Sequence, residues 1–271
     1  MGKIIAFANQ KGGVGKTTTC INVAAYIAAM GKKVLIIDMD PQGNASSGVG
    51  IEKSNETKTM YNVISKELLI DEVIQNTCLE VLDIVPATVD LAGAEIDLVQ
   101  MPHREHVVKT ALNRVKDKYD FIFIDCPPSL GLITVNALTA ADSVLIPIQC
   151  HFYALEGLTQ LMNTIHLIIH HLNPELQIVG VVLTMKDNRS NLVEQVSDEV
   201  RKFFNKKVYE TCIPQNIRLA EAPSHGLPIL LYDTASKGAN AYMSLAEEIL
   251  DRNKVSYEKI TKSTKIKVRR K

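Results

Sequence analysis

The chain has 271 residues, of which 46% are hydrophobic and 22% charged, and its formal net charge is zero. This length and composition can bury a sizeable core, and no apolar run approaches the roughly 20 residues needed to span a bilayer. The five cysteines are scattered and form no C-x-x-C pair. Such spacing excludes the usual zinc and disulfide patterns and predicts reduced thiols in a cytoplasm.

Apolar runs of strand length alternate with longer helical patterns along the chain. Strands are predicted at Lys3–Asn9, Lys33–Asp40, Leu79–Pro86, Tyr119–Asp125, Ser143–Gln149, Ile178–Met185, Val208–Ile213 and Pro228–Tyr232, and helices at Lys16–Met30, His103–Lys118, Leu155–Leu172, Asn191–Phe204 and Ala239–Asn253. Most strand runs are nearly continuous in Val, Ile and Leu, as in strands covered on both faces. We therefore expect an α/β fold, a doubly wound and mostly parallel sheet flanked by helices.

The charge is unevenly distributed. Residues 252–271 contain nine Lys or Arg and one acid, a net charge of +8, so the other residues hold 21 cations against 29 acids, or −8. We predict one domain over residues 1–251 and a basic C-terminal tail over residues 252–271. An acidic body with a basic tail suggests an anionic partner for the tail, and a solvated, frayed terminus is the alternative.

The stretch N-Q-K-G-G-V-G-K-T-T-T, residues 9–19, joins the first predicted strand to the first predicted helix. Strand, glycine-rich loop and helix in this order indicate a phosphate-binding loop, because glycines let backbone N–H groups surround phosphate oxygens. Lys16 supplies a charge for the outer phosphates, and Thr17 a hydroxyl for Mg²⁺. Thr18 adds an N–H at the positive end of the helix dipole. The loop also contains a second cation, Lys11, at its front edge.

Three carboxylates follow two of the other predicted strands. Asp38 and Asp40 end the run V-L-I-I-D-M-D, and Asp125 ends the run F-I-F-I-D. Ligands of doubly wound sheets bind beyond the carboxyl ends of the strands, where these acids and the loop converge. A carboxylate after four apolar residues is typical of nucleotide hydrolases, in which it helps to hold the Mg²⁺ shell.

The motifs K-G-G-V-G-K-T-T, D-M-D-P-Q-G-N and F-I-F-I-D-C-P-P-S resemble the ParA/Soj branch of the deviant Walker-A P-loop ATPases, whose relatives include MinD. The resemblance covers roughly residues 1–250. It implies a cytoplasmic, nucleoid-associated ATPase that forms a homodimer when ATP is bound and binds double-stranded DNA without sequence preference. It also implies that a ParB/Spo0J-type partner stimulates hydrolysis and that the cycle segregates chromosomes or plasmids.

The resemblance assigns roles to individual residues. Lys11 reaches across the dimer to the phosphates of the other subunit, and Asp40 positions the attacking water. Asp38 and Asp125 lie in the second shell of a Mg²⁺ ion held by Thr17. Hydrolysis should be slow without partners. The expected ATP-binding residues are Lys11, Gly12, Gly13, Val14, Gly15, Lys16, Thr17, Thr18 and, on the adenine side, Pro214 and Asn216; the expected catalytic residues are Lys11, Lys16 and Asp40.

The anionic partner is expected to be DNA. The resemblance places Arg189 and Arg218 on the DNA-facing surface, and contacts of this kind go to phosphates. A MinD-like membrane-associated switch is the alternative, but the tail ends in K-I-K-V-R, which has a strand-like period, whereas membrane binding requires an amphipathic helix. Two further alternatives have less support. An iron–sulfur reductase needs cysteines that bind a cluster, whereas Cys126 fits core packing, and a small-molecule kinase needs a pocket for the phosphate acceptor, which the sequence does not indicate.

Overall fold

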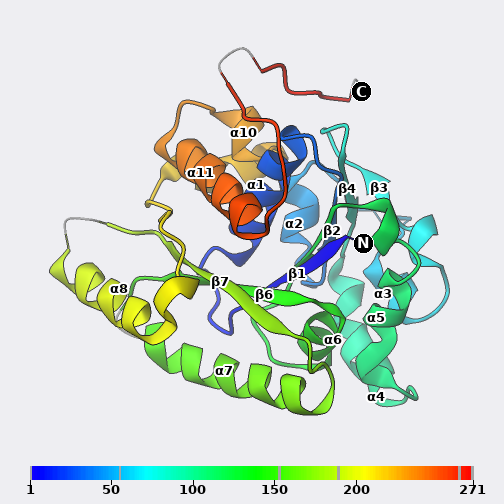
Figure 1. Ribbon diagram of the computed structural model, residues 1–271. Helices are drawn as coiled ribbons and strands as arrows, with labels where there is room; N and C mark the ends of the chain where they lie inside the picture. The colour runs from blue at the N-terminus through cyan, green and yellow to red at the C-terminus, as the bar shows by residue number, and fades with distance from the viewer. Residues whose placement is uncertain (1, 55, 152–153, 188–189, 262–263, 270–271) are drawn as a thin grey trace.

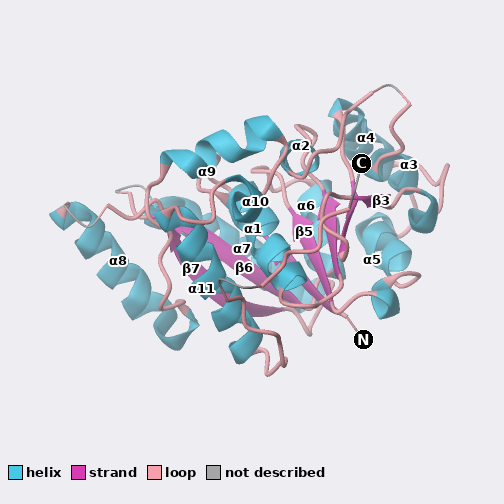
Figure 2. Ribbon diagram, turned by 90° about the horizontal axis from the view of Figure 1, so that it is seen from above, coloured by secondary structure: helices cyan, strands magenta, loops and turns pink. Residues whose placement is uncertain are grey.

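The computed structural model describes residues 2–54, 56–151, 154–187, 190–261 and 264–269. A twisted sheet runs through the middle of the molecule, and helices cover both of its faces (Figures 1 and 2). The strands are β1 (Lys3–Phe7), β2 (Val34–Asp38), β3 (Gln75–Asn76), β4 (Leu82–Val85), β5 (Phe121–Asp125), β6 (Ser143–Gln149) and β7 (Gln177–Thr184). Their order is β3-β4-β2-β5-β1-β6-β7, and only the short edge strand β3 pairs antiparallel.

The helices are α1 (Lys16–Ala29), α2 (Asn44–Gly48), α3 (Met60–Ile64), α4 (Ala94–Val99), α5 (Val107–Leu112), α6 (Leu132–Ala140), α7 (Ala154–His171), α8 (Asn191–Phe204), α9 (Ile217–Glu221), α10 (Ile229–Tyr232) and α11 (Lys237–Arg252). Two apolar cores lie on opposite faces of the sheet: α3 to α8 pack in one, and α1, α2, α9, α10 and α11 in the other. In β1, Ile4 and Ala6 belong to the first core, and Ile5 and Phe7 to the second. This alternation confirms the predicted doubly wound sheet, because successive side chains of a strand point to opposite faces.

Six of the eight predicted strands are found, but two predictions were wrong. Residues 208–213 do not form a strand: they make an isolated bridge between Val181 and Val208, two backbone bonds to β7, and one backbone bond from the N–H of Lys186 to the carbonyl of Ile213. Pro228–Tyr232 is the helix α10, whose first N–H, that of Ile229, donates to the side chain of Asn22 at 2.7 Å. A short apolar run does not distinguish a buried strand from a buried helix, and Pro228 precedes the helix, a position where its missing N–H has no cost.

The helical predictions were also corrected. The expected helix His103–Lys118 is broken: α5 covers only its middle, and His103 has a left-handed φ of 54°. The short helices α2, α3, α4, α6 and α9 were not predicted, because most of them are too short to show a clear 3.6-residue period.

All five cysteines are free thiols, and Cys126 is fully buried in the core. Among the described residues, no helix combines the length and the hydrophobicity that crossing a bilayer requires.

Candidate functional site

The loop between β1 and α1 has a backbone that suits glycine. Gly13 and Gly15 have positive φ values of 72° and 84°, where a side chain would be strained. A Cβ added at Gly12 or Gly13 would meet no protein atom within 4 Å, so these residues border open space. Gly15 precedes α1, which places the positive end of the helix dipole at the same opening. The loop therefore offers backbone N–H groups to an anion.

Two side chains that the sequence reasoning did not single out fix the shape of this loop. Asn9 donates from Nδ2 to the carbonyl of Pro147 at 2.7 Å, and its Oδ1 accepts from the N–H of Lys11 at 3.0 Å. Thr184, at the end of β7, donates from its hydroxyl to the carbonyl of Val14 at 2.8 Å. An Asn side chain bonding the N–H two residues on is a local turn signal, whereas the contact with Thr184 spans 170 residues and has no local signal.

Lys16 is buried, with 6% of its surface exposed, and its Nζ donates to the backbone carbonyl of Lys11 at 3.3 Å. Burial lowers the pKa of the Lys16 ammonium, and the nearby carboxylates of Asp125 and Asp40 act in the opposite direction. For the Lys11 ammonium, which is on a half-buried residue, no hydrogen bond or ion pair is found within the described part of the chain. The loop thus contains one tethered cation and one cation available to another group.

Asp125 is fully buried at the end of β5, and neither carboxylate oxygen has a hydrogen-bond partner among the described residues. Burial raises the pKa of Asp125 well above its usual range, and repulsion from Asp38 adds to this; the hydroxyl of Thr17, which lies nearby without making a hydrogen bond of normal geometry, and the ammonium of Lys16 oppose it. A buried, unsatisfied carboxylate is costly unless a cation or its bound water completes it. The residues present therefore fit a hydrated Mg²⁺ ion between Thr17 and Asp125.

Asp38 lies beside Asp125 in the register of β2 and β5, as the shared sheet edge predicted. Its Oδ1 accepts from the N–H of Asp40 at 3.2 Å, and its Oδ2 accepts from the N–H and the hydroxyl of Ser46 at 2.8 and 2.7 Å. Burial raises the pKa of Asp38 to about 6, although the bonds from Ser46 lower it in part. Asp38 therefore holds the segment between β2 and α2 in place, with the help of Ser46, a residue that the sequence reasoning did not identify.

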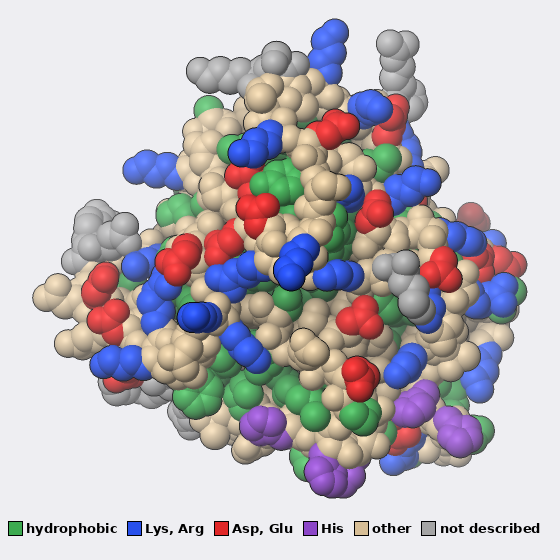
Figure 3. Space-filling view, viewed as in Figure 1, with side chains coloured by type: hydrophobic (Ala, Val, Ile, Leu, Met, Phe, Trp, Pro, Cys, Tyr) green, Lys and Arg blue, Asp and Glu red, His purple; other side chains and the backbone are tan. Residues whose placement is uncertain are grey.

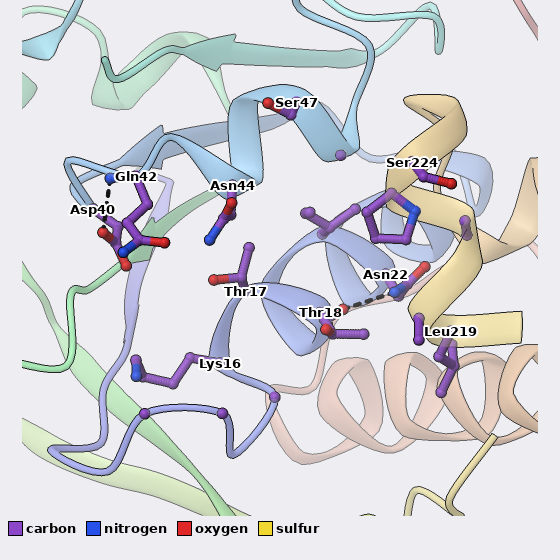
Figure 4. Close-up of a pocket in the computed structure, with 18 of the residues that line it drawn as sticks. Lys16, Thr17, Thr18, Asn22, Asp40, Gln42, Asn44, Ser47, Leu219 and Ser224 are labelled. Carbon is purple, nitrogen blue, oxygen red and sulfur yellow. Dashed lines mark hydrogen bonds between the residues drawn. The ribbon is translucent and has the colours of Figure 1, made fainter. Parts of the chain in front are cut away.

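Asp40 follows β2 and lines the cavity that the glycine loop faces. It is 8% exposed, and its Oδ1 accepts from the N–H of Gln42 at 3.0 Å. In Figure 4, Asp40 and Gln42, from the segment after β2, stand across an opening from Lys16 and Thr17, which lie at the start of α1. This opening is a cavity of about 690 Å³ lined by Gly12, Gly13, Gly15, Lys16, Thr17, Thr18 and Asp40, among others.

A second cavity of about 420 Å³ adjoins the first, and the two share Gly15, Thr18 and Leu219 in their linings. Pro214 and Asn216, the residues expected on the adenine side, both line this second cavity. The Oδ1 of Asn216 accepts from the N–H of Arg218 at 2.9 Å as the N-cap of α9, which leaves its amide nitrogen as a donor toward a ligand. The two cavities together have the size and polarity gradient that suit a nucleotide.

The two arginines expected to contact DNA are in different situations. Arg218 is half exposed on α9, and its guanidinium pairs with Glu221 at 2.9 Å and Asp233 at 3.5 Å. A DNA phosphate would therefore compete with two carboxylates for this side chain. Arg189 lies outside the described residues.

Comparison with known proteins agrees with this geometry. A family described as an AAA domain (AAA_31) matches residues 2–178. The chain is 58% identical over 249 residues to the sporulation initiation inhibitor protein Soj of Bacillus subtilis, covering 92% of this chain and 98% of that protein. It is 49% identical over 253 residues to the chromosome-partitioning ATPase Soj of Treponema pallidum, covering 93% and 99%.

A solved structure has the same fold. The cobyrinic acid a,c-diamide synthase of Mycobacterium smegmatis, solved with an ATP analogue and magnesium, is 32% identical with a TM-score of 0.82 and covers 96% of this chain and 100% of its own. The identities to the two Soj proteins, over nearly their whole lengths, are far higher. Taken with the glycine loop, its two lysines and the three carboxylates, they show that this chain belongs to the ParA/Soj family of partitioning ATPases.

Proposed function

We propose that this chain is an ATPase of DNA segregation that dimerises on binding ATP, with residues 1–251 as the ATPase domain and residues 252–271 as a basic tail. One observation carries the proposal. The buried and unsatisfied Asp125 lies beside Thr17 and Lys16, where the glycine loop faces a cavity of about 690 Å³. This arrangement supports ATP with Mg²⁺ as the ligand, because it combines donors for phosphates with an acceptor for a hydrated cation.

The chain's own residues account for binding and positioning. The N–H groups of the loop and the ammonium of Lys16 hold the phosphates, while Pro214 and Asn216 contact the base. Thr17 would hold the Mg²⁺ ion through its hydroxyl, and Asp125 and Asp38 would accept hydrogen bonds from the water molecules bound to it. When bound, Mg²⁺ neutralises charge that develops on the phosphate oxygens.

Hydrolysis requires a water molecule in line with the outer phosphate. Asp40 lines the phosphate cavity, and we assign it the orientation of this water. The Lys11 ammonium, which has no partner in the described part of the chain, neutralises the phosphates bound by the second subunit. A site that needs a cation from a partner subunit is slow in the monomer, and a ParB/Spo0J-type protein would stimulate it.

The ATP-bound dimer binds double-stranded DNA without sequence preference through Arg189 and Arg218, and the protein is accordingly cytoplasmic and nucleoid-associated. Arg218 would exchange its contacts with Glu221 and Asp233 for a phosphate. The cargo is a chromosome or a plasmid, and the name of the Treponema pallidum relative supports the chromosome.

The test compares the protein in three states: with a non-hydrolysable ATP analogue and Mg²⁺, with ADP and Mg²⁺, and without nucleotide. Sedimentation velocity should give a dimer only with the ATP analogue, and fluorescence anisotropy with labelled duplex DNA should show the tightest binding in that state. A protein that stays monomeric with uncleaved ATP at tens of micromolar would refute the proposal.

A further inference from the structure

Where the glycine loop leaves β1, one side chain takes over a contact of the sheet. The N–H of Ala8 donates to the carbonyl of Leu145 in β6 at 3.2 Å. Two residues further along β6, the carbonyl of Pro147 accepts from the side-chain amide of Asn9 at 2.7 Å. Asn9 is buried, with 6% of its surface exposed. Its Nδ2 therefore satisfies a carbonyl of β6 while the main chain turns away from the sheet.

The same side chain also holds the main chain of Lys11. The Oδ1 of Asn9 accepts from the N–H of Lys11 at 3.0 Å, and the Lys16 ammonium donates to the carbonyl of Lys11 at 3.3 Å. Both main-chain polar groups of Lys11 are therefore bonded. On the face of the molecule in Figure 3, Lys and Arg side chains lie among Asp and Glu side chains that can neutralise them. The Lys11 ammonium has no such partner within the described residues, so a fixed main chain carries an unpaired cation.

A second contact holds the rear of the loop. The hydroxyl of Thr184 in β7, the strand beside β6, donates to the carbonyl of Val14 at 2.8 Å. Val14 lies between Gly13 and Gly15, which line the phosphate cavity, whereas Lys11 precedes them at the front edge of the loop. Two adjacent strands therefore hold two different parts of the loop, each through one buried polar side chain.

We infer that Asn9 is a positioning residue for Lys11: by fixing its main chain, Asn9 directs the Lys11 ammonium toward the second subunit. The inference rests on the proposed function, in which Lys11 neutralises phosphates bound by that subunit. A lysine side chain loses much rotamer freedom when its ammonium is held, and a main chain that is already ordered lowers the remaining cost of the contact. Thr184 then supports binding of the subunit's own nucleotide, and Asn9 supports dimerisation.

The test separates this role from a purely structural one with three variants of the full chain. Asn9→Leu keeps the approximate size of the side chain and removes both hydrogen bonds. Asn9→Ser is the partial rescue, because a hydroxyl can accept from the N–H two residues on but has no amide for Pro147. Asn173→Leu is the matched control. Asn173 is also buried, and its Nδ2 donates to the carbonyls of Leu138 and Ala141 at 3.1 and 2.7 Å, next to the amino ends of β6 and β7.

Each protein is measured in the same four ways. Sedimentation velocity over a concentration series, with the ATP analogue and Mg²⁺, gives the dissociation constant of the dimer. Isothermal titration calorimetry at monomer concentrations gives the affinity for the analogue. Hydrogen exchange followed by NMR gives the protection of the Lys11 N–H. Urea unfolding shows that each variant is folded under the conditions of the other measurements.

Asn9→Leu should raise the dissociation constant of the dimer by about tenfold or more, while the affinity for the analogue stays within about threefold of wild type. The Lys11 N–H should lose its protection in this variant. Asn9→Ser should recover part of the dimer affinity and part of the protection. Asn173→Leu should keep both, although it also lowers the free energy of unfolding, because two buried carbonyls lose their donor.

Three results would overturn the inference: wild-type dimerisation by Asn9→Leu, an equal loss of analogue affinity and dimer affinity in that variant, or the same dimer defect in Asn173→Leu. A wild-type protein that stays monomeric with the analogue would refute the proposed function and this inference with it. A dimeric wild type beside an unaffected Asn9→Leu would refute the inference alone, so the two failures are distinguishable.

Discussion

The ammonium of Lys16 donates a hydrogen bond to the backbone carbonyl of Lys11 across 3.3 Å. The contact uses the side chain of one lysine and only the main chain of the other. Truncating Lys11 therefore leaves the position of Lys16 unchanged, whereas truncating Lys16 removes both the hydrogen bond and the buried charge. The contributions of the two lysines can be separated by mutation.

Nucleotide binding should depend on Lys16 and hardly on Lys11. Lys16→Ala should weaken binding of the ATP analogue by on the order of 100-fold, since a charge-assisted hydrogen bond contributes about 1.5–3 kcal/mol and an ammonium can donate more than one to the phosphates. Lys11→Ala should stay within about threefold of wild type. Isothermal titration calorimetry at monomer concentrations measures both, and equal effects in the two variants would contradict the assignment.

Dimerisation should depend on Lys11. With the ATP analogue and Mg²⁺, Lys11→Ala should sediment as a monomer at concentrations where wild type is dimeric, because the phosphates of each subunit then lack the second cation. Lys33→Ala, a change at an exposed lysine at the amino end of β2, opposite the edge of the sheet that holds the loop, is the matched control and should dimerise normally. A Lys11→Ala protein that pairs as wild type does would refute the role of Lys11.

Hydrolysis should depend on Asp40 more than binding does. In the structure, Oδ1 of Asp40 accepts a hydrogen bond from the N–H of Gln42 at 3.0 Å. In Asp40→Asn the amide oxygen can accept the same bond, so the local fold is retained. We expect phosphate release in a single turnover to fall by about 10² to 10³, with analogue binding within a few-fold of wild type. Hydrolysis at the wild-type rate would exclude Asp40 from positioning the water.

The titration of Asp38 should make the free energy of unfolding depend on pH. Its pKa is raised by burial to about 6 in the folded protein, from 3.8, so the folded state binds more protons than the unfolded state between these values. The free energy of unfolding should therefore fall as the pH rises from 4 to 6, by at most about 3 kcal/mol from this group.

Urea unfolding in Mg²⁺-free buffer measures this effect. Asp38→Asn should make the free energy of unfolding less dependent on pH between pH 4 and 6, even if the substitution also shifts that free energy by a constant amount. Asp125 continues to contribute to the pH dependence in the same direction in both proteins. Parallel curves for wild type and Asp38→Asn would show that Asp38 does not titrate as described.

Thr184 should matter for a loop that is remote in sequence. Thr184→Val leaves the carbonyl of Val14 buried without its donor, which costs about 1–3 kcal/mol of stability. Because the loop then loses its fixed shape, the affinity for the ATP analogue should fall by about tenfold. Thr184→Ser keeps the hydroxyl and should restore affinity; calorimetry that finds no difference between Val and Ser at this position would contradict the idea.

The sequence predicted those parts of the structure that are coded locally. Continuous Val, Ile and Leu runs located six of the strands, since a parallel sheet covered on both faces requires them. The glycine loop and the aspartates at strand ends could be placed at one edge of the sheet because parallel strands end together. The same reasoning failed at Pro228–Tyr232, where four apolar residues form a helix whose first N–H is bonded by Asn22.

The supporting contacts of the site could not be predicted, because they follow no local sequence pattern. Thr184 of β7 bonds Val14 across 170 residues, and Ser46 of α2 bonds Asp38 across eight residues, a spacing that matches no standard turn or helix contact. The C-terminal segment that contains Arg269 is a further case. The alternation of Lys and Ile predicted an extended segment, but it did not predict that the guanidinium of Arg269 donates to three backbone carbonyls near β4. Only the folded topology brings such partners together.

The bond from Thr184 to Val14 has a consequence for fragments of this protein. The family match ends at residue 178, yet Thr184, which bonds the glycine loop, and Pro214 and Asn216, which line the cavity proposed for the base, all come later. A piece truncated at that point would retain all three signature motifs, but its glycine loop would lack the bond from Thr184 and the proposed base cavity would lack these two residues. The presence of the three motifs therefore does not show that a truncated chain still binds its nucleotide.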